Sequence, residues 1–164
     1  MTDNSTIRGL VVGAGHMGIS HARAYHKLDG FEICGVVTRT QASSQAMFDE
    51  LGPFPQFTDF EEALKKSRPN AVSISSYTET HRPFTMAALA MGCHVFVEKP
   101  LAESVEKAQE IADMASETGR KVLVGYILRH HPSWIRFIEI AQSLGKPLVM
   151  RMNLNQQSNA LNMI

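Results

Sequence analysis

The sequence has little of what marks several classes of protein. Only two of its 164 residues are cysteines, Cys34 and Cys93, and their spacing favours reduced core thiols over a disulfide framework. Lysine plus arginine and aspartate plus glutamate both number 16, so no basic excess points to nucleic acid. No apolar run approaches the roughly 18 residues of a membrane span, and residues 1–7 lack a signal-peptide pattern. These absences predict a cytoplasmic globular protein that binds neither nucleic acid nor a membrane.

Short apolar runs alternate with amphipathic stretches along most of the chain. The pattern predicts strands over residues 7–12, 31–38, 71–75, 94–97 and 122–124, and helices over 16–28, 42–51, 58–66, 80–91, 104–118 and 132–144. Thr58 and Glu61 have the spacing of a capping box, which predicts that the third helix begins there. Strands that alternate with helices favour right-handed βαβ crossovers. The predicted fold class is α/β, with a doubly wound parallel sheet covered by helices on both faces.

Residues 13–18 read Gly-Ala-Gly-His-Met-Gly and match the Gly-x-Gly-x-x-Gly pattern of dinucleotide binding. A predicted strand precedes the motif and a predicted helix follows it. In that context Gly13 permits a tight turn, Gly15 lets the backbone approach a pyrophosphate, and Gly18 allows close packing of helix on strand. The helix N-terminus then offers free N–H groups to the anion. The motif predicts a Rossmann domain; the alternative is a glycine turn in an α/β protein that binds no nucleotide.

The residues after the second predicted strand indicate which dinucleotide is preferred. A carboxylate at that position would bind the adenosine ribose 2′-hydroxyl and repel a 2′-phosphate. Thr38, Arg39 and Thr40 stand there instead. Arg39 can form a bidentate pair with a phosphate, and the two hydroxyls can add hydrogen bonds. The sequence therefore favours NADP(H) over NAD(H); the alternative is a solvated Arg39 that stacks on adenine without discriminating.

Glu98, Lys99 and Pro100 follow the strand predicted over residues 94–97. They should therefore lie at the carboxyl edge of the sheet, where ligands bind in open α/β folds. A lysine there, partly desolvated beside a cofactor, can exchange a proton with a substrate hydroxyl while a hydride moves to or from nicotinamide. Glu98 can pair with Lys99 or hold a cofactor hydroxyl. A Glu-Lys pair is more often a surface pair, so this motif alone leaves both interpretations open.

Three features together resemble the glucose–fructose oxidoreductase / inositol dehydrogenase (Gfo/Idh/MocA) family. They are the glycine motif, His81, and residues 92–102, which read Gly-Cys-His-Val-Phe-Val-Glu-Lys-Pro-Leu-Ala. The resemblance covers residues 6–155 and implies an enzyme that oxidises or reduces sugars, inositols or related polyols with NAD(P). Residues 125–132 resemble the family's crossover into a second domain, with Arg129 and Pro132 matching.

The resemblance also assigns roles to single residues. It implies that Lys99 is the catalytic residue and that the Lys99–Pro100 peptide bond is cis. Residues 76–78 read Ser-Tyr-Thr, which departs from the Thr-Pro-Asn frequent in the family. The cofactor-binding residues predicted from the motifs and the resemblance are Gly13, Gly15, His16, Met17, Gly18, Thr38, Arg39, Ser76, Tyr77, His81, Glu98, Lys99 and Arg129.

Members of this family have about twice the length of this chain, in two domains. We therefore expect a cofactor domain over residues 1–125, then a crossover helix and the beginning of a truncated α+β domain over residues 126–164. A strand is expected over residues 148–154. The resemblance implies that the second domain walls the substrate site and makes the full-length form a homo-oligomer. The alternative function is a cofactor-binding module or fragment without turnover.

The seven histidines raise the question of a metal site. His16, His21 and His26 recur every five residues, which places them about 140° apart on a helix rather than on one face. We therefore expect no metal site. No tyrosine has a lysine four residues later, which excludes the Tyr-x-x-x-Lys pair of a short-chain dehydrogenase.

Overall fold

The computed structural model describes residues 6–146, 149 and 151. Its backbone contacts divide the chain into two compact units, Met1–Tyr126 and Ile127–Ile164. The strand predicted over residues 148–154 falls largely outside the described residues. The substrate-binding and oligomer roles expected of the second part stay predictions.

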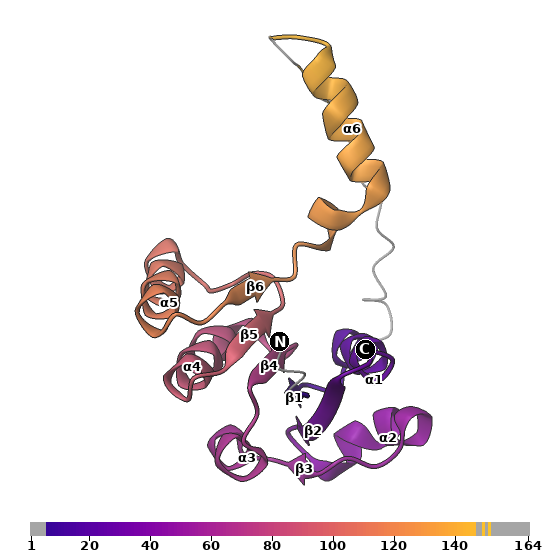
Figure 1. The fold of residues 1–164 in the computed structure, drawn as a ribbon, viewed down its shortest axis with the longest axis vertical. Helices are drawn as coiled ribbons and strands as arrows, with labels where there is room; N and C mark the ends of the chain where they lie inside the picture. The colour runs from indigo at the N-terminus through magenta and orange to yellow at the C-terminus, as the bar shows by residue number, and fades with distance from the viewer. Residues whose placement is uncertain (1–5, 147–148, 150, 152–164) are drawn as a thin grey trace, which may run out of the picture. The chain divides into compact units, whose positions relative to one another are not determined.

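The first unit is a parallel sheet with helices between its strands (Figure 1). The strand order is β3-β2-β1-β4-β5-β6, and every neighbouring pair is parallel. This order is that of the dinucleotide-binding Rossmann fold, so the predicted fold class is confirmed. The strands are β1 (Ile7–Val12), β2 (Phe31–Val37), β3 (Gln56–Phe57), β4 (Ala71–Ile74), β5 (His94–Val97) and β6 (Val122–Val124), and the helices are α1 (His16–His26), η1 (Gln41–Ser44), α2 (Gln45–Leu51), α3 (Phe60–Ser67), α4 (Thr78–Ala90) and α5 (Val105–Thr118).

Helices cover both faces of this sheet because successive strand residues point to opposite sides. Leu10 belongs to a core cluster with residues of α3, α4 and α5, whereas the next residue, Val11, belongs to a cluster with residues of α1 and α2. Figure 1 shows these two sets of helices on opposite sides of the strands. On the α1 face, Leu123 of β6 is 54% exposed. Near β1 the strands are thus buried on both faces. There the order in which successive strands are added to the sheet changes side.

Two local predictions differ from the structure. The capping box predicted at Thr58 is wrong, because Asp59 is the N-cap of α3 and its carboxylate accepts a hydrogen bond from the Glu62 N–H over 2.7 Å. A carboxylate at this position also interacts favourably with the helix dipole, which favours aspartate over the neighbouring threonine. The pattern did not predict β3, a two-residue strand that pairs only with β2.

The order of the strands creates a crevice beside β1. Since β1 lies between β2 and β4, the connections from the carboxyl ends of β1 and β4 lead to helices on opposite faces of the sheet. Ligands of doubly wound sheets bind at such a switch point. The loop after β1 carries the glycine motif, and the loop after β4 carries Ser75 and Ser76.

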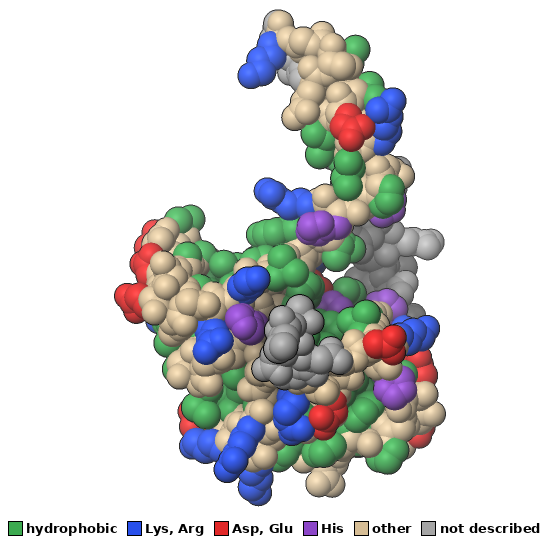
Figure 2. All heavy atoms as spheres, viewed as in Figure 1, with side chains coloured by type: hydrophobic (Ala, Val, Ile, Leu, Met, Phe, Trp, Pro, Cys, Tyr) green, Lys and Arg blue, Asp and Glu red, His purple; other side chains and the backbone are tan. Residues whose placement is uncertain are grey.

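The second unit contains η2 (Ile127–His130) and α6 (Pro132–Ser143). His131 caps α6, and Pro132 occupies its first turn, where a missing N–H costs nothing. None of the helix residues is buried, and apolar side chains along α6 reach the surface (Figure 2). Within the part of the chain that the structure describes, no helix combines the length and the apolar character needed to cross a membrane.

Candidate functional site

A cavity of about 580 Å³ lies beside the carboxyl ends of β1, β2 and β4. Six of the predicted cofactor-binding residues line it, namely Gly13, Gly15, Thr38, Arg39, Ser76 and Tyr77. Ser43, Thr58, Phe60, Thr80 and Phe84 also line it and were not predicted. Thr58 and Phe60 flank the N-cap of α3, so this part of the cavity wall depends on where β3 ends and α3 begins. The sequence pattern did not predict β3 and predicted the wrong N-cap for α3. The size and position of the cavity suit a small organic ligand.

The glycine motif has the geometry that its sequence predicts. Gly13 has φ of +93°, and an added Cβ would lie 2.6 Å from the Ser75 carbonyl oxygen. A Cβ on Gly18 would overlap the Gly13 carbonyl oxygen, so only glycine lets α1 approach the end of β1 this closely. Gly15 is the N-cap of α1, no side chain caps the helix there, and no atom lies within 4 Å of an added Cβ. The first N–H groups of α1 therefore face open space and can bind an anion.

At the end of β2, the polar side chains form hydrogen bonds with one another and with the backbone of their own loop. Thr38 is buried, and its hydroxyl donates to the Thr40 carbonyl over 2.8 Å, so it can offer a ligand only an acceptor. The hydroxyl oxygens of Thr40 and Ser43 lie 2.7 Å apart. Gln56 of β3 donates to the Gln41 carbonyl over 2.8 Å and so holds this loop against the sheet.

Arg39 is exposed at the rim of the same cavity. Its guanidinium carbon lies 5.0 Å from the centre of the Tyr77 ring, a cation–π contact between the loops after β2 and β4. No ion pair joins Arg39 to another residue in the described part of the chain. Its five N–H donors are therefore available to an anionic ligand.

The end of β5 places Glu98 and Lys99 differently. Glu98 is 7% exposed, and its Oε2 accepts a hydrogen bond from the Lys99 backbone N–H over 3.2 Å. The Lys99 side chain is exposed, and the Lys99–Pro100 peptide bond is cis, as the family resemblance implied. Lys99 is thus held by its backbone while its side chain is free to meet a ligand.

His81 lies between the loop after β4 and the turn after β5, and it does not line the cavity. It is 1% exposed, and its Nδ1 lies 2.7 Å from the Pro100 carbonyl oxygen. Its Nε2 lies 3.1 Å from the Ser76 carbonyl oxygen. Carbonyl oxygens thus face both ring nitrogens, and since a neutral imidazole has one N–H, the ring donates to one of them. The predicted contact of His81 with a cofactor stays a prediction.

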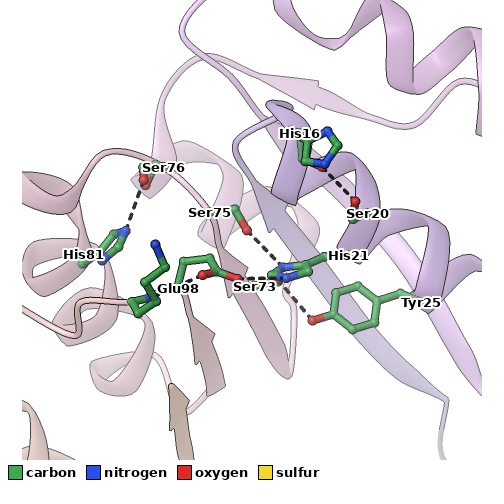
Figure 3. Close-up of polar contacts among 10 residues, drawn as sticks. His16, Ser20, His21, Tyr25, Ser73, Ser75, Ser76, His81 and Glu98 are labelled. Carbon is green, nitrogen blue, oxygen red and sulfur yellow. Dashed lines mark hydrogen bonds and ion pairs between the residues drawn. The ribbon is translucent and has the colours of Figure 1, made fainter. Parts of the chain in front are cut away.

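A buried polar cluster on α1 and β4 was missed by the analysis of the sequence (Figure 3). Its centre is His21, whose Nε2 lies 3.2 Å from Glu98 Oε1 and whose Nδ1 lies 3.0 Å from the Ser75 hydroxyl and 3.1 Å from that of Ser73. Tyr25 donates to Ser73 over 3.2 Å. Burial lowers the pKa of His21, although the adjacent Glu98 carboxylate opposes this shift. Burial likewise raises the pKa of Tyr25.

Two other predicted residues of the first unit, His16 and Met17, do not line the cavity. His16 and Met17 are exposed in the first turn of α1, and the His16 carbonyl accepts a hydrogen bond from Ser20. Arg129 lies on η2 in the second unit, and its cofactor contact stays a prediction. Within the described residues, no group of three or more His, Cys, Asp or Glu side chains could hold a metal ion.

Comparison with known proteins supplies three relevant similarities. Residues 7–126 match the sequence profile of the GFO_IDH_MocA oxidoreductase family, described as an NAD-binding Rossmann fold. The chain is 31% identical over 149 residues to inositol 2-dehydrogenase of Agrobacterium fabrum, covering 88% of this chain and 44% of that protein. It is 32% identical over 127 residues to 4-carboxy-2-hydroxymuconate-6-semialdehyde dehydrogenase of a Sphingobium species, covering 77% and 40%.

The fold is also similar to that of solved structures. The crystal structure of scyllo-inositol dehydrogenase from Lactobacillus casei, with bound NAD(H) and scyllo-inositol, matches with a TM-score of 0.76 and 26% identity. The match covers 86% of this chain and 42% of that one. The chain therefore spans less than half the length of these relatives.

Proposed function

The chain belongs to the Gfo/Idh/MocA oxidoreductase family, whose Rossmann fold binds NAD, and we propose that it is the cofactor-binding part of a sugar or polyol dehydrogenase. The proposed reaction moves a hydride between a nicotinamide cofactor and a CH–OH group of a sugar, inositol or related polyol. One observation carries this proposal. The open N-terminus of α1, the cavity and the Lys99 turn all lie at the carboxyl edge of one parallel sheet.

The residues at this edge fit a dinucleotide. The uncapped N–H groups after Gly15 would hold the pyrophosphate, since they face open space. Thr38 and Arg39 would bind the adenosine ribose, and Tyr77 would bound the same end of the cavity. The nicotinamide end would then extend toward the turn at Lys99, where the bound ring would supply the hydride chemistry.

Lys99 would move the proton that accompanies the hydride. Its Nζ would take the proton of the substrate hydroxyl during oxidation and return it to the carbonyl oxygen during reduction. The backbone of Lys99 is held by the Glu98 carboxylate, whereas its side chain is free, which suits a group that must reach a substrate.

We also propose that the chain prefers NADP(H) over NAD(H). The exposed guanidinium of Arg39 can form charge-assisted hydrogen bonds with a 2′-phosphate, and no carboxylate at position 38 repels it. Such a contact contributes about 1.5–3 kcal/mol, or roughly 10- to 100-fold in affinity. The relative from Lactobacillus casei was solved with NAD(H), so the proposed preference rests on this chain's own residues after β2.

The substrate class is proposed from the relatives, and the homo-oligomeric state of the full-length form is proposed from the family resemblance alone. Inositol 2-dehydrogenase and scyllo-inositol dehydrogenase act on or bind inositols, which are cyclic polyols. Another relative is a dehydrogenase of a muconate semialdehyde, so a similar Rossmann unit serves different substrates. We infer that the substrate is selected largely by groups outside the Rossmann unit.

Replacing Lys99 tests this function. In the active protein, Lys99→Ala should lower kcat by about 1,000-fold or more, because it removes the proton-transfer group, and leave the Kd for NADPH within a few-fold. Turnover would be measured with a panel of inositols and hexoses by the absorbance of reduced nicotinamide. Lys107→Ala, which removes an exposed lysine paired with Glu103, is the matched control and should be neutral. Retention of more than about a tenth of wild-type kcat by Lys99→Ala would contradict the assignment.

A further inference from the structure

Glu98 is a buried carboxylate with few partners. Its side chain is 10% exposed, and Oε2 accepts the Lys99 backbone N–H. No described residue makes a well-aligned hydrogen bond to Oε1, and the His21 ring faces this oxygen, with its Nε2 3.2 Å away. Gly125 closes the remaining side, since a Cβ added there would lie 2.9 Å from Oε1. Burying a carboxylate that lacks a hydrogen-bond donor is costly, and the His21 ring that faces Oε1 is placed to offset that cost.

The hydrogen bonds around His21 have a consistent direction. Tyr25 donates to Ser73, which leaves the Ser73 proton free to point at His21 Nδ1; Ser75 can donate to the same nitrogen. With Nδ1 as acceptor, the proton of the neutral ring is on Nε2, the nitrogen that faces Glu98. Figure 3 shows Ser73, Ser75 and Glu98 next to the His21 ring. The edge of Phe96 also packs against the ring, with centroids 4.8 Å apart.

We propose that His21 is a positioning residue for Lys99, acting through Glu98. The ring holds the Glu98 carboxylate in the orientation in which its other oxygen accepts the Lys99 N–H, and so fixes the backbone from which the Lys99 side chain extends. The role in catalysis rests on the proposed function, whereas the role in holding the turn does not. His21 comes from α1, so the same helix that offers its N-terminus to an anion also orients the turn after β5.

Amide hydrogen exchange of the chain, followed by NMR, tests the holding role directly. His21→Leu removes the donor that faces Glu98 and should make the Lys99 amide exchange roughly tenfold faster or more, since its acceptor is no longer held. The Val36 amide of β2, which donates to the Pro55 carbonyl, serves as an internal reference for global stability and should not change. His26→Leu, at an exposed position of the same helix, is the matched control.

A conservative variant separates positioning from packing. His21→Gln keeps an amide donor of similar reach and should restore most of the Lys99 protection, whereas His21→Asn is too short and should not. If His21→Leu does not fold, the comparison of the Gln and Asn variants answers the same question. Lys99 exchange within about twofold of wild type in the Leu variant, or equal in the Gln and Asn variants, would overturn the proposal.

Kinetics extend the test to the reaction. In the active protein, His21→Leu should lower kcat by roughly tenfold and leave the Kd for NADPH within about twofold, with rescue of kcat by His21→Gln. A wild-type protein that turns over no polyol would count against the proposed function, while the exchange result would still decide the role of His21. A changed Kd with unchanged kcat would overturn the catalytic part of the proposal.

Discussion

The two ends of the crevice are built in opposite ways. At the end of β5, Glu98 is 7% exposed and lies among His21, Gly125 and the backbone of its own turn. At the end of β2, Arg39 is exposed and has the Tyr77 ring as its described neighbour. The first end is enclosed by three elements, whereas the second is exposed, with its loop held by Gln56 of β3.

This difference separates the two tasks of a cofactor site. A group that transfers a proton must be placed accurately, and buried partners that lock its surroundings provide that accuracy. A group that distinguishes a 2′-phosphate from a hydroxyl needs charge and reach, and an exposed arginine provides both. Substitutions at the β5 end should therefore change stability or rate, and substitutions at the β2 end should change specificity with little effect on stability.

The largest effect on stability is expected where the glycine motif joins α1 to the sheet. Gly18→Ala places a Cβ on the Gly13 carbonyl oxygen, so α1 must move away from β1 and carry His21 with it. Overpacking of this kind costs about 1–3 kcal/mol or more, which lowers Tm by roughly 5–10 °C in a chain of this size. Thermal unfolding followed by circular dichroism measures it.

Gly15→Ala is the matched control for that variant. Its φ of −74° suits alanine, and an added Cβ meets no atom within 4 Å. Tm should stay within about 2 °C of wild type, while affinity for NADPH falls because the Cβ stands where the pyrophosphate approaches. Equal Tm values for the two variants would contradict the close-packing role of Gly18.

An intermediate effect, on cofactor specificity, is expected at the end of β2, where Arg39 is exposed. Arg39→Asp should reverse the cofactor preference, because the carboxylate would repel a 2′-phosphate and accept hydrogen bonds from a 2′-hydroxyl. The ratio of the NADH and NADPH dissociation constants should change by roughly 100-fold, with Tm unchanged. Lys65→Asp makes the same charge change at an exposed helix position and should leave the ratio as it is. An unchanged ratio in Arg39→Asp would show that Arg39 does not bind the 2′-phosphate.

The smallest effect is the pH dependence that His21 gives to stability. Its folded-state pKa is lowered by burial, so the unfolded chain binds the proton more readily. The stabilisation is complete above the ordinary histidine value near pH 6.5 and is lost as pH falls toward the lowered pKa. The groups around the ring are Glu98, which opposes the shift, and the uncharged Tyr25, Ser73 and Ser75.

Tm should therefore decrease as pH is lowered from about 7.5 to 5.5, and His21→Gln should reduce that decrease by an amount on the order of a few degrees. His26→Gln is the control on the same helix and should keep the wild-type dependence. A pH dependence that is the same in wild type and His21→Gln would contradict the lowered pKa of His21.

The parts of the site that could be predicted are those encoded in short runs of sequence. The turn at residues 13–18 and the Glu98-Lys99-Pro100 turn are local motifs that follow strands, so the strand order brings them to one edge. His21 escaped because its partner Glu98 is distant in the sequence and the contact forms only when α1 packs across β4 and β5. Its position three residues after Gly18 on a sheet-facing helix was the available signal.

Other differences have the same origin. The end of β2 was predicted, but the hydrogen bond from the Thr38 hydroxyl to the Thr40 carbonyl depends on the conformation of the local turn. The ring of His81 lies between the carbonyl oxygens of Ser76 and Pro100, and its contact with Pro100 forms only when the turn after β5 packs against α4. Side-chain partners across elements depend on packing, which a periodic pattern does not encode.

We expect the carboxyl edge of this Rossmann unit to bind a nicotinamide dinucleotide. Isothermal titration of the 164-residue chain with NADPH and NADH, run in parallel on wild type and Gly15→Ala, tests it most directly. We expect saturable binding of one dinucleotide per chain. Binding should be tighter for NADPH than for NADH and weaker in Gly15→Ala than in wild type. A folded chain that binds neither dinucleotide, or that binds both equally well in wild type and Gly15→Ala, would contradict it.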